Sequence, residues 1–244
     1  NVQVGIFFWV CSVEVSRYTS LRSMNQSIIT CPTSLVKNWE SEINKWLGDR
    51  CPCLALAESS REKAIKAINT FLAPPQHLAK SLDGRKRSQI IIMSYETFRL
   101  HTDRFLAASV SPCDLLVCDE AHRLKNSETL TNTSLNALPC RKRVLLSGTP
   151  MQNDLTEFHA MVDFTNPGIF GGEENFRRRY MAPILAGREK TATDSQRRKM
   201  VIVQGEVSEL VNKFILRRTN TLNAKHLPPK LTQIVCCKPT SLQV

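Results

Sequence analysis

Five short apolar segments recur along the chain, separated by helical or polar stretches. The five segments cover residues 27–31, 53–57, 89–93, 114–118 and 143–147. Several of them are continuously apolar, without the alternation of apolar and polar residues. Runs of this length and character are typical of strands that are covered on both faces of a parallel sheet. The pattern therefore predicts five strands, most of them buried.

Apolar residues at helical spacing mark two segments between these strands. The first helix is predicted from Ser34, which can cap it, to the residue before Gly48, which can end it. The second begins at a capping-box pattern over residues 59–62 and runs to Phe71. Alternation of strand and helix predicts an α/β domain with a mainly parallel sheet flanked by helices.

The last third of the chain differs from the rest in charge. Residues 28–165 hold 17 basic and 15 acidic residues, whereas residues 166–244 hold 14 and 6, which is +8 of the net +11. An amphipathic helix is predicted over residues 207–218 and a last strand over 231–237. A basic segment beside a near-neutral body indicates a polyanion partner or a solvated surface. Arg177, Arg178 and Arg179 are the residues that we expect to contact such a polyanion.

The composition excludes several classes of protein. With 42% hydrophobic residues the chain can build a sizeable core, and no apolar run approaches the ~20 residues of a membrane-spanning helix. The nine cysteines form no Cys-x-x-Cys pair and no Cys/His cluster with zinc-ligand spacing. We therefore expect reduced thiols in a nuclear or cytosolic compartment. No membrane partner is expected.

An apolar strand running directly into two acids is the sharpest chemical signal. Asp119 and Glu120 follow the segment 114–118, so both carboxylates are expected at the carboxyl edge of the sheet, where ligands bind in such folds. There Asp119 is suited to hold Mg²⁺ beside nucleotide phosphates, and Glu120 to activate water. His122 can report on the phosphate site. Taken alone, the pair favours the interpretation that these acids cap the helix that follows the strand.

Polar residues also follow three other predicted strands. Small hydroxyl residues and a glycine after residue 146 allow close backbone approach to the acids. A turn with exposed N–H groups, hydroxyls and a lysine after residue 31 suits a nucleic-acid phosphate. The segment 94–97 is a third polar strand end.

Four of these segments resemble, in chain order, motifs of the SWI/SNF-type helicase-like ATPases. They read Cys-Pro-Thr-Ser-Leu-Val-x-Asn-Trp, Ser-Tyr-Glu-Thr, Asp-Glu-Ala-His-Arg-Leu-Lys-Asn and Leu-Ser-Gly-Thr-Pro-Met-Gln-Asn-Asp-Leu. Segments 214–219 and 227–230 are similar to that family's stretch toward its second lobe. Segments 164–170, 183–189 and 235–238 resemble the recombination-repair translocases of the Rad-fifty-four type. The resemblance covers residues 28–244.

The resemblance implies a RecA-like lobe that works with a second lobe to move along double-stranded DNA. It implies Mg²⁺ and ATP as cofactors, a nuclear location, and a recombinase filament or chromatin as partner. Asp119 and Glu120 would be the metal-binding and water-activating acids. Coupling of hydrolysis to DNA movement would fall to His122, Ser147, Gly148, Thr149 and Gln152. Contacts to the DNA backbone would come from Pro32, Thr33, Ser34, Lys37, Ser94 and Tyr95.

One departure from the family pattern concerns the phosphate-binding loop. Such a loop needs Gly-x-x-x-x-Gly-Lys-Ser/Thr, and the sequence contains no Gly-Lys dipeptide. We therefore expect an incomplete, catalytically inactive first lobe over residues 28–165, a basic helical extension over 166–244 leading toward a missing second lobe, and a divergent or mistranslated segment 1–27. The alternative is a non-catalytic DNA-binding or scaffold protein derived from the same lobe.

Overall fold

A computed structural model describes residues 26–48, 51–57, 60–73, 90–108, 113–124, 129–148 and 154–217, together with positions 233, 235 and 237. The chain divides into two compact units, residues 1–177 and 178–244, which are described separately. The functional boundary expected between residues 165 and 166 stays a prediction.

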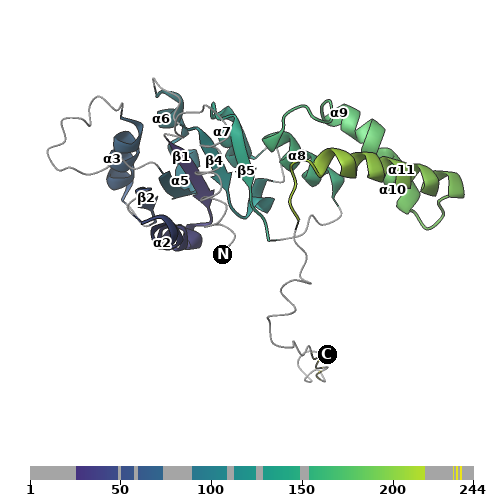
Figure 1. Cartoon of the computed structure of the whole chain (residues 1–244), viewed down its shortest axis with the longest axis horizontal. Helices are drawn as coiled ribbons and strands as arrows, with labels where there is room; N and C mark the ends of the chain where they lie inside the picture. Colours follow the sequence, from purple (N-terminus) through teal and green to yellow (C-terminus); the bar gives the residue numbers. More distant parts are fainter. Residues whose placement is uncertain are drawn as a thin grey trace, which may run out of the picture. The chain divides into compact units, whose positions relative to one another are not determined.

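A five-stranded parallel sheet forms the centre of the described part of the first unit (Figure 1). Its order is β2-β3-β1-β4-β5. The strands are β1 (Ser27–Cys31), β2 (Cys53–Leu56), β3 (Ile90–Ser94), β4 (Leu115–Cys118) and β5 (Lys142–Leu145). All four pairings are parallel, which confirms the predicted α/β class.

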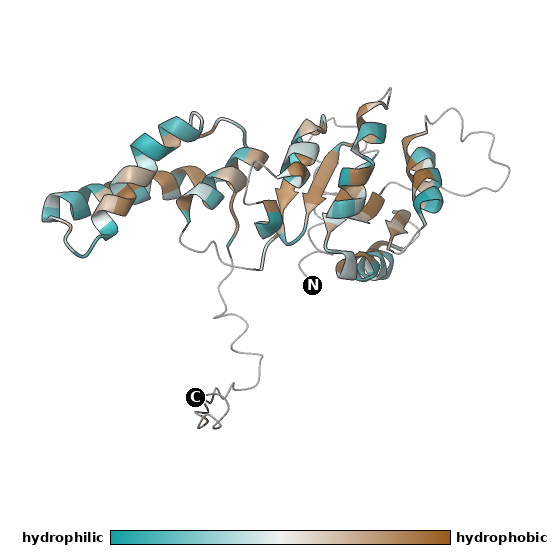
Figure 2. Ribbon diagram, turned by 180° about the vertical axis from the view of Figure 1, so that it is seen from behind, coloured by the Kyte–Doolittle hydropathy of each residue, from teal (hydrophilic) through white to brown (hydrophobic). Residues whose placement is uncertain are grey.

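Helices cover both faces of this sheet. One face packs against α2 (Val36–Leu47), which follows the 3-10 turn η1 (Thr33–Leu35). The other face packs against five helices: α3 (Arg61–Leu72), α5 (Tyr95–Leu100), α6 (Thr102–Leu106), α7 (Leu130–Ala137) and α8 (Leu155–Thr165). Figure 2 shows the apolar strands between helices whose polar residues face outward. The short α9 (Glu173–Phe176) completes the unit.

The helix starts differ in detail from the sequence predictions. Ser34 does not cap the first helix, because one 3-10 turn precedes α2 and neither start has a side-chain cap. The predicted stop is confirmed: Gly48 adopts φ +52°, which favours glycine. The cap of α3 is Ser60, whose side chain accepts from the Lys63 N–H, and not Ser59.

The described helices of the second unit pack as a hairpin. The π-helical turn η4 (Arg177–Met181) leads into α10 (Ala182–Arg188), which packs along α11 (Asp194–Val211). The helix predicted over residues 207–218 is therefore wrong in both bounds. A capping box at Thr193 and Gln196 starts α11 upstream, and the chain leaves the helix at Asn212.

The strand predicted over residues 231–237 lies largely outside the described residues. Gln233, Val235 and Cys237 are described there, and none of the three is in a strand. Among the helices that the structure describes, none is both long and apolar enough to cross a membrane.

Candidate active site

The carboxyl ends of the three central strands meet at one edge of the sheet. Cys31 of β1 pairs with Ser94 of β3, and Thr30 pairs with Cys118 of β4. The residues that follow these strands are therefore brought together although they are up to 90 positions apart in the chain. This edge is where the sequence predicted the site.

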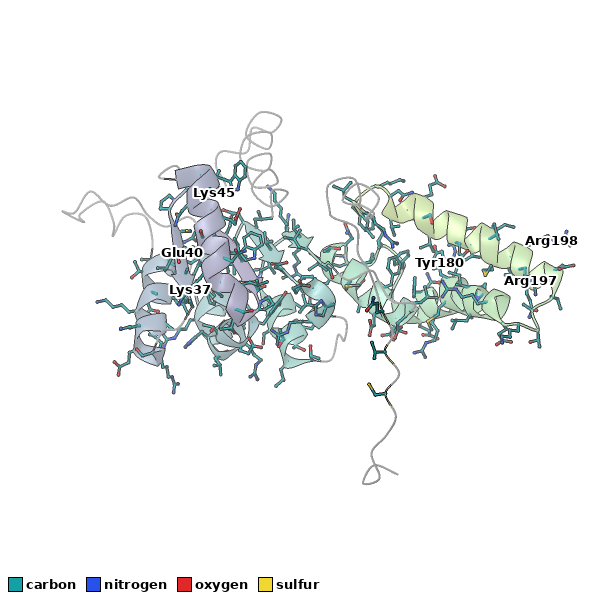
Figure 3. All side chains as sticks on the ribbon, turned by 90° about the horizontal axis from the view of Figure 1, so that it is seen from below. Lys37, Glu40, Lys45, Tyr180, Arg197 and Arg198 are labelled. Atoms are coloured by element: carbon teal, nitrogen blue, oxygen red, sulfur yellow. The ribbon has the colours of Figure 1, made fainter. Side chains whose placement is uncertain are left out.

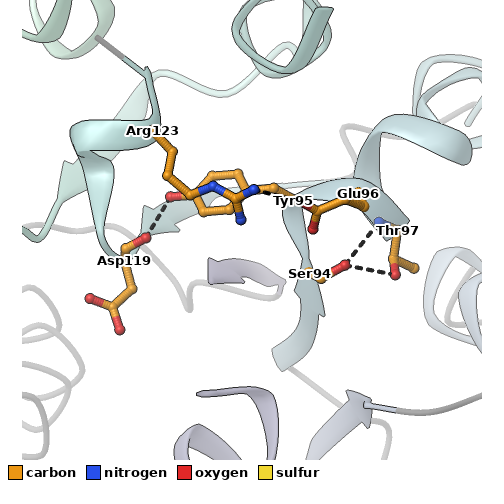
Figure 4. Close-up of polar contacts among 6 residues, drawn as sticks. All are labelled: Ser94, Tyr95, Glu96, Thr97, Asp119 and Arg123. Atoms are coloured by element: carbon orange, nitrogen blue, oxygen red, sulfur yellow. Dashed lines mark hydrogen bonds and ion pairs between the residues drawn. The ribbon is translucent and has the colours of Figure 1, made fainter. Parts of the chain in front are cut away.

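The backbone of Asp119 is held from two neighbouring elements. Its N–H donates to the Thr30 carbonyl at 2.8 Å, and its carbonyl accepts from the Tyr95 hydroxyl at 2.6 Å (Figure 4). Burial raises the pKa of Tyr95 well above its usual value, so the hydroxyl stays a proton donor. Asp119 is thus fixed relative to both β1 and α5.

The Asp119 carboxylate has a donor on each oxygen. Oδ2 accepts from Nε1 of Trp39 in α2 at 2.8 Å, and Oδ1 accepts from the Glu120 N–H at 2.9 Å. Trp39 is only 3% exposed. Trp39 lies within the first predicted helix, and its place in the Asn-Trp motif was the one signal in the sequence of a role at the site.

Glu120 adopts an unusual backbone conformation. Its φ is +51°, the left-handed region that non-glycine residues enter at a cost of about 1–2 kcal/mol. Its Oε2 lies 3.3 Å from Nδ1 of the neighbouring His122, and both side chains are partly exposed. His122 therefore contacts the predicted water-activating acid directly.

The hydrogen bonds of Asp119 and Glu120 show whether these acids cap the helix that follows them. The 3-10 helix η3 (Ala121–Leu124) follows them. The described hydrogen bond of the Asp119 carboxylate to backbone goes to Glu120, the residue before η3. The Ala121 N–H, the first of η3, donates instead to the Leu146 carbonyl. These contacts give the acids little part in capping.

Leu146, the first residue after β5, is hydrogen-bonded through both its N–H and its carbonyl to residues 118–123, which we call the acidic segment. The Leu146 N–H donates to the Cys118 carbonyl at 2.9 Å, and the Leu146 carbonyl accepts from the Ala121 N–H at 2.9 Å. Ser147 and Gly148 follow immediately and are exposed. The other two coupling candidates in this segment, Thr149 and Gln152, lie outside the described residues.

The predicted DNA contacts fall into two groups by exposure. Thr33, Ser34 and Lys37 are exposed on η1 and the first turn of α2, and Pro32 is half-buried before them. Figure 3 shows Lys37 with Glu40 and Lys45 along α2. These positions form a polar outer surface next to the acidic edge.

Ser94 and Tyr95 are instead buried, with exposed fractions of 3% and 1%. The Ser94 hydroxyl caps α5 by accepting from the Thr97 N–H at 3.0 Å, and the Tyr95 hydroxyl bonds to Asp119 (Figure 4). Their side chains therefore support the site from inside. Direct contact of either side chain with DNA stays a prediction that these bonds do not favour.

The three consecutive arginines are exposed. Arg177 forms an ion pair with Glu173 at 3.7 Å. Arg179, in the second unit, lies 3.4 Å from Glu206, and its guanidinium is 5.1 Å from the ring centre of Tyr180. Within the described residues Arg178 has no ion-pair partner. Arg178 is thus the arginine best suited to a new anionic partner.

Asp119 offers the oxygen ligand that Mg²⁺ prefers. The described residues contain no group of three or more His, Cys, Asp or Glu side chains that could hold a metal by themselves. Mg²⁺ beside a nucleotide usually takes one or two carboxylates together with phosphate oxygens and water. A single well-placed carboxylate at this edge fits that kind of site.

Comparison with known proteins gives consistent matches over nearly the whole chain. A model of the SNF2-related domain family matches residues 9–244. Protein CHROMATIN REMODELING 25 of Arabidopsis thaliana and DNA repair and recombination protein RAD54 of Oryza sativa subsp. japonica are each 53% identical over 220 residues, 90% of this chain. A RAD54-like protein of Drosophila willistoni is 40% identical over 222 residues, 91% of this chain.

The chain spans about a quarter of the length of these curated relatives, 23%, 21% and 27% respectively. The family match begins inside segment 1–27, and the expected assignment of that segment stays a prediction.

Two solved structures share the fold. The Sulfolobus solfataricus SWI2/SNF2 ATPase core in complex with dsDNA has a TM-score of 0.63 at 22% identity, and it covers 90% of this chain and 38% of that one. The Sulfolobus solfataricus SWI2/SNF2 ATPase core domain has a TM-score of 0.56 at 24% identity, with coverage of 84% and 35%. The expected RecA-like architecture of an ATPase lobe is confirmed.

Proposed function

The chain belongs to the SNF2-related domain family, and on this premise we propose that it is the first ATPase lobe of an enzyme that moves along double-stranded DNA. The observation that carries the proposal is the position of Asp119. Trp39 of α2, Tyr95 of α5 and Thr30 of β1 all bond to it, and each belongs to or adjoins a segment with a family motif.

Each acid has a separate proposed role. Asp119 would hold Mg²⁺ through its carboxylate, and the bound ion would supply charge neutralisation for phosphoryl transfer. Glu120 orients and deprotonates the attacking water, with His122 beside its carboxylate. Ser147 and Gly148 lie close along the chain to Leu146, whose backbone bonds join the segment after β5 to the acids. A movement of the segment after β5 therefore displaces the two acids, and a movement of the acids displaces that segment.

Duplex DNA is the proposed substrate. The archaeal core with the same fold is described in complex with dsDNA, and two similar proteins are DNA repair and recombination proteins. The exposed surface of η1 and α2, with Thr33, Ser34 and Lys37, is the proposed contact. By the same similarity we propose a nuclear role in recombination repair or chromatin remodelling, with a recombinase filament or chromatin as partner.

A loop that holds the nucleotide phosphates is the missing part of this scheme. The sequence has no Gly-Lys dipeptide, so we propose that residues 1–244 alone bind DNA but hydrolyse ATP at no useful rate. The same observation favours the second candidate, a non-catalytic DNA-binding or scaffold protein built on this lobe.

The DNA contact can be tested by measuring how affinity depends on salt. Binding through phosphates is independent of sequence and weakens steeply as salt rises, by roughly one unit of log–log slope per phosphate contact. We expect this behaviour for labelled duplexes of unrelated sequence, and a shallower slope for Lys37→Ala and Arg178→Ala. Lys63→Ala, an exposed lysine in α3, is the matched control. A flat salt dependence between low and moderate ionic strength would contradict the proposal.

A further inference from the structure

Helix α2 carries both a proposed DNA contact and a hydrogen bond to Asp119, the proposed metal-binding acid. Lys37 is exposed in the first turn of α2, whereas Trp39, two residues later, is buried. The Trp39 indole donates to Asp119 Oδ2 at 2.8 Å, across 80 positions of sequence. Because a helix moves as a unit, displacement of α2 from outside shifts this indole.

The orientation of the Asp119 carboxylate depends on that bond. Its backbone is fixed by Thr30 and Tyr95, and Oδ1 is held by the N–H of the next residue. Among the described residues, Trp39 is the one side-chain donor to the carboxylate. A hydrogen bond to an ionised group, made by a side chain withdrawn from water, is among the stronger kinds in proteins. Trp39 is therefore placed to set the side-chain angle of Asp119.

We propose that Trp39 is a positioning residue that links DNA contact at η1 and α2 to the orientation of the Asp119 carboxylate. The link rests on the proposed function, since it requires duplex DNA at that surface. Coupling between two sites is reciprocal, so a change at Asp119 also changes how α2 meets DNA. The consequence is regulatory: the metal-binding acid takes its working orientation when DNA is in place.

The same helix supplies a matched control. Trp46 also donates its indole N–H to a carboxylate, Glu42 Oε2 at 3.0 Å, but this acceptor is one turn away on α2 and the side chain is 38% exposed. The chain has three tryptophans, at positions 9, 39 and 46. Trp9→Phe/Trp46→Phe leaves Trp39 as the only indole, and Trp9→Phe/Trp39→Phe leaves Trp46.

The experiment follows indole emission and the anisotropy of a labelled duplex in the same titration at low salt. In the protein that retains Trp39, we expect the emission to shift in parallel with the rise in anisotropy. Adding Asp119→Ala to this protein should shift the emission before DNA is added. It should also abolish the DNA-induced shift, while the duplex still binds with an altered affinity. The protein that retains Trp46 should bind DNA with no parallel shift.

Each alternative result is decisive. A rise in anisotropy with unchanged Trp39 emission would overturn the link and leave DNA binding intact. A shift that survives Asp119→Ala, or one equally large at Trp46, would also overturn it, because the signal would then not pass through the Trp39–Asp119 bond. If anisotropy does not rise at all, the proposed DNA contact fails and the link fails with it.

Discussion

Arg123 and Glu96 join the acidic segment to the helix that supports it: Nη2 of Arg123 lies 2.6 Å from Oε1 of Glu96. The same guanidinium is 5.3 Å from the ring centre of Tyr95, whose hydroxyl bonds to Asp119 (Figure 4). The ion pair therefore closes over the residue that fixes the backbone of Asp119. Its removal is expected to loosen the site before it unfolds the protein.

The Glu96 contribution to stability should depend on pH. Partial burial acts to raise the pKa of Glu96, but hydrogen bonds from its own backbone N–H and from Arg123 outweigh burial and lower it overall. A lowered pKa gives stability that is present above the unfolded-state value and lost as pH falls through the folded-state value. Both side chains are more than a third exposed, so the pair is worth about 0.2–1 kcal/mol.

We therefore expect Glu96→Gln to lower the free energy of unfolding by about 0.2–1 kcal/mol at pH 7, with the difference vanishing below the ordinary glutamate range near pH ~4. Urea unfolding at pH 7 and at a pH below ~4 measures this difference in the free energy of unfolding. Glu174→Gln, at an exposed glutamate, is the control. An equal loss at neutral and acid pH would show that the effect is not due to the charge of Glu96.

Two glycines in the helical hairpin should respond in opposite ways to alanine. A Cβ at Gly187 would lie 2.4 Å from Cβ of Met200 and 2.9 Å from the Gln196 carbonyl oxygen. A Cβ at Gly205, within α11, would meet nothing within 4 Å. Gly187→Ala should destabilise the hairpin by about 1–3 kcal/mol, and Gly205→Ala should stabilise it by up to about 1 kcal/mol.

Thermal unfolding followed by circular dichroism compares the two variants with the parent chain. A Gly187→Ala protein at least as stable as Gly205→Ala would show that α10 and α11 do not pack as described.

Buried thiols at the sheet should be unreactive. Burial, with a smaller contribution from the Asp119 charge, raises the pKa of Cys31 to about 12, and burial raises the pKa of Cys118 to about 12. At pH 8 a thiol with such a pKa is roughly one part in ten thousand thiolate, the reactive form. Iodoacetamide should therefore label the exposed Cys237 and spare both.

Mass spectrometry of tryptic peptides measures the labelling, and the same reaction in denaturant, where all nine cysteines are accessible, is the control. Labelling of Cys31 at the rate of Cys237 in the native protein would contradict the buried position of β1.

The strands could be predicted from the sequence because burial on both faces leaves a continuous apolar run. The predicted segments 27–31 and 89–93 match β1 and β3 to within one residue. The predicted end of β5 is too late by two residues. There Leu146 has left the strand and bonds across to Cys118 and Ala121, an arrangement that hydrophobicity does not encode.

The parts that could not be predicted depend on contacts distant in sequence. Trp39 meets Asp119 only because the sheet places β4 beside β1 and α2 packs over both. Ser94 and Tyr95 have polar groups typical of a binding surface, and only the packing of α5 shows that they face inward. The start of α11 was missed because Val201 and Ile202, each 63% exposed, obscure the helical spacing of the buried side.

The isolated chain and a completed enzyme should differ in ATP hydrolysis. Positioning and electrostatics supply nearly all phosphoryl-transfer catalysis, and an arginine from a facing lobe is typically worth ~10³–10⁵ in rate. We expect residues 1–244 to release phosphate no faster than their own Glu120→Gln variant, with or without duplex DNA. Turnover above that variant would show that the chain holds an unrecognised phosphate site.

The central claim is that Glu120 activates water for ATP hydrolysis at the carboxyl edge of the sheet, beside Asp119. The most direct measurement is phosphate release, stimulated by duplex DNA, from a chimera in which this chain replaces the matching part of the rice relative. We predict that Glu120→Gln lowers turnover by about 10²–10⁴-fold while Mg²⁺–ATP binding is retained, because only proton transfer is removed. Near-normal turnover in that variant would contradict the account.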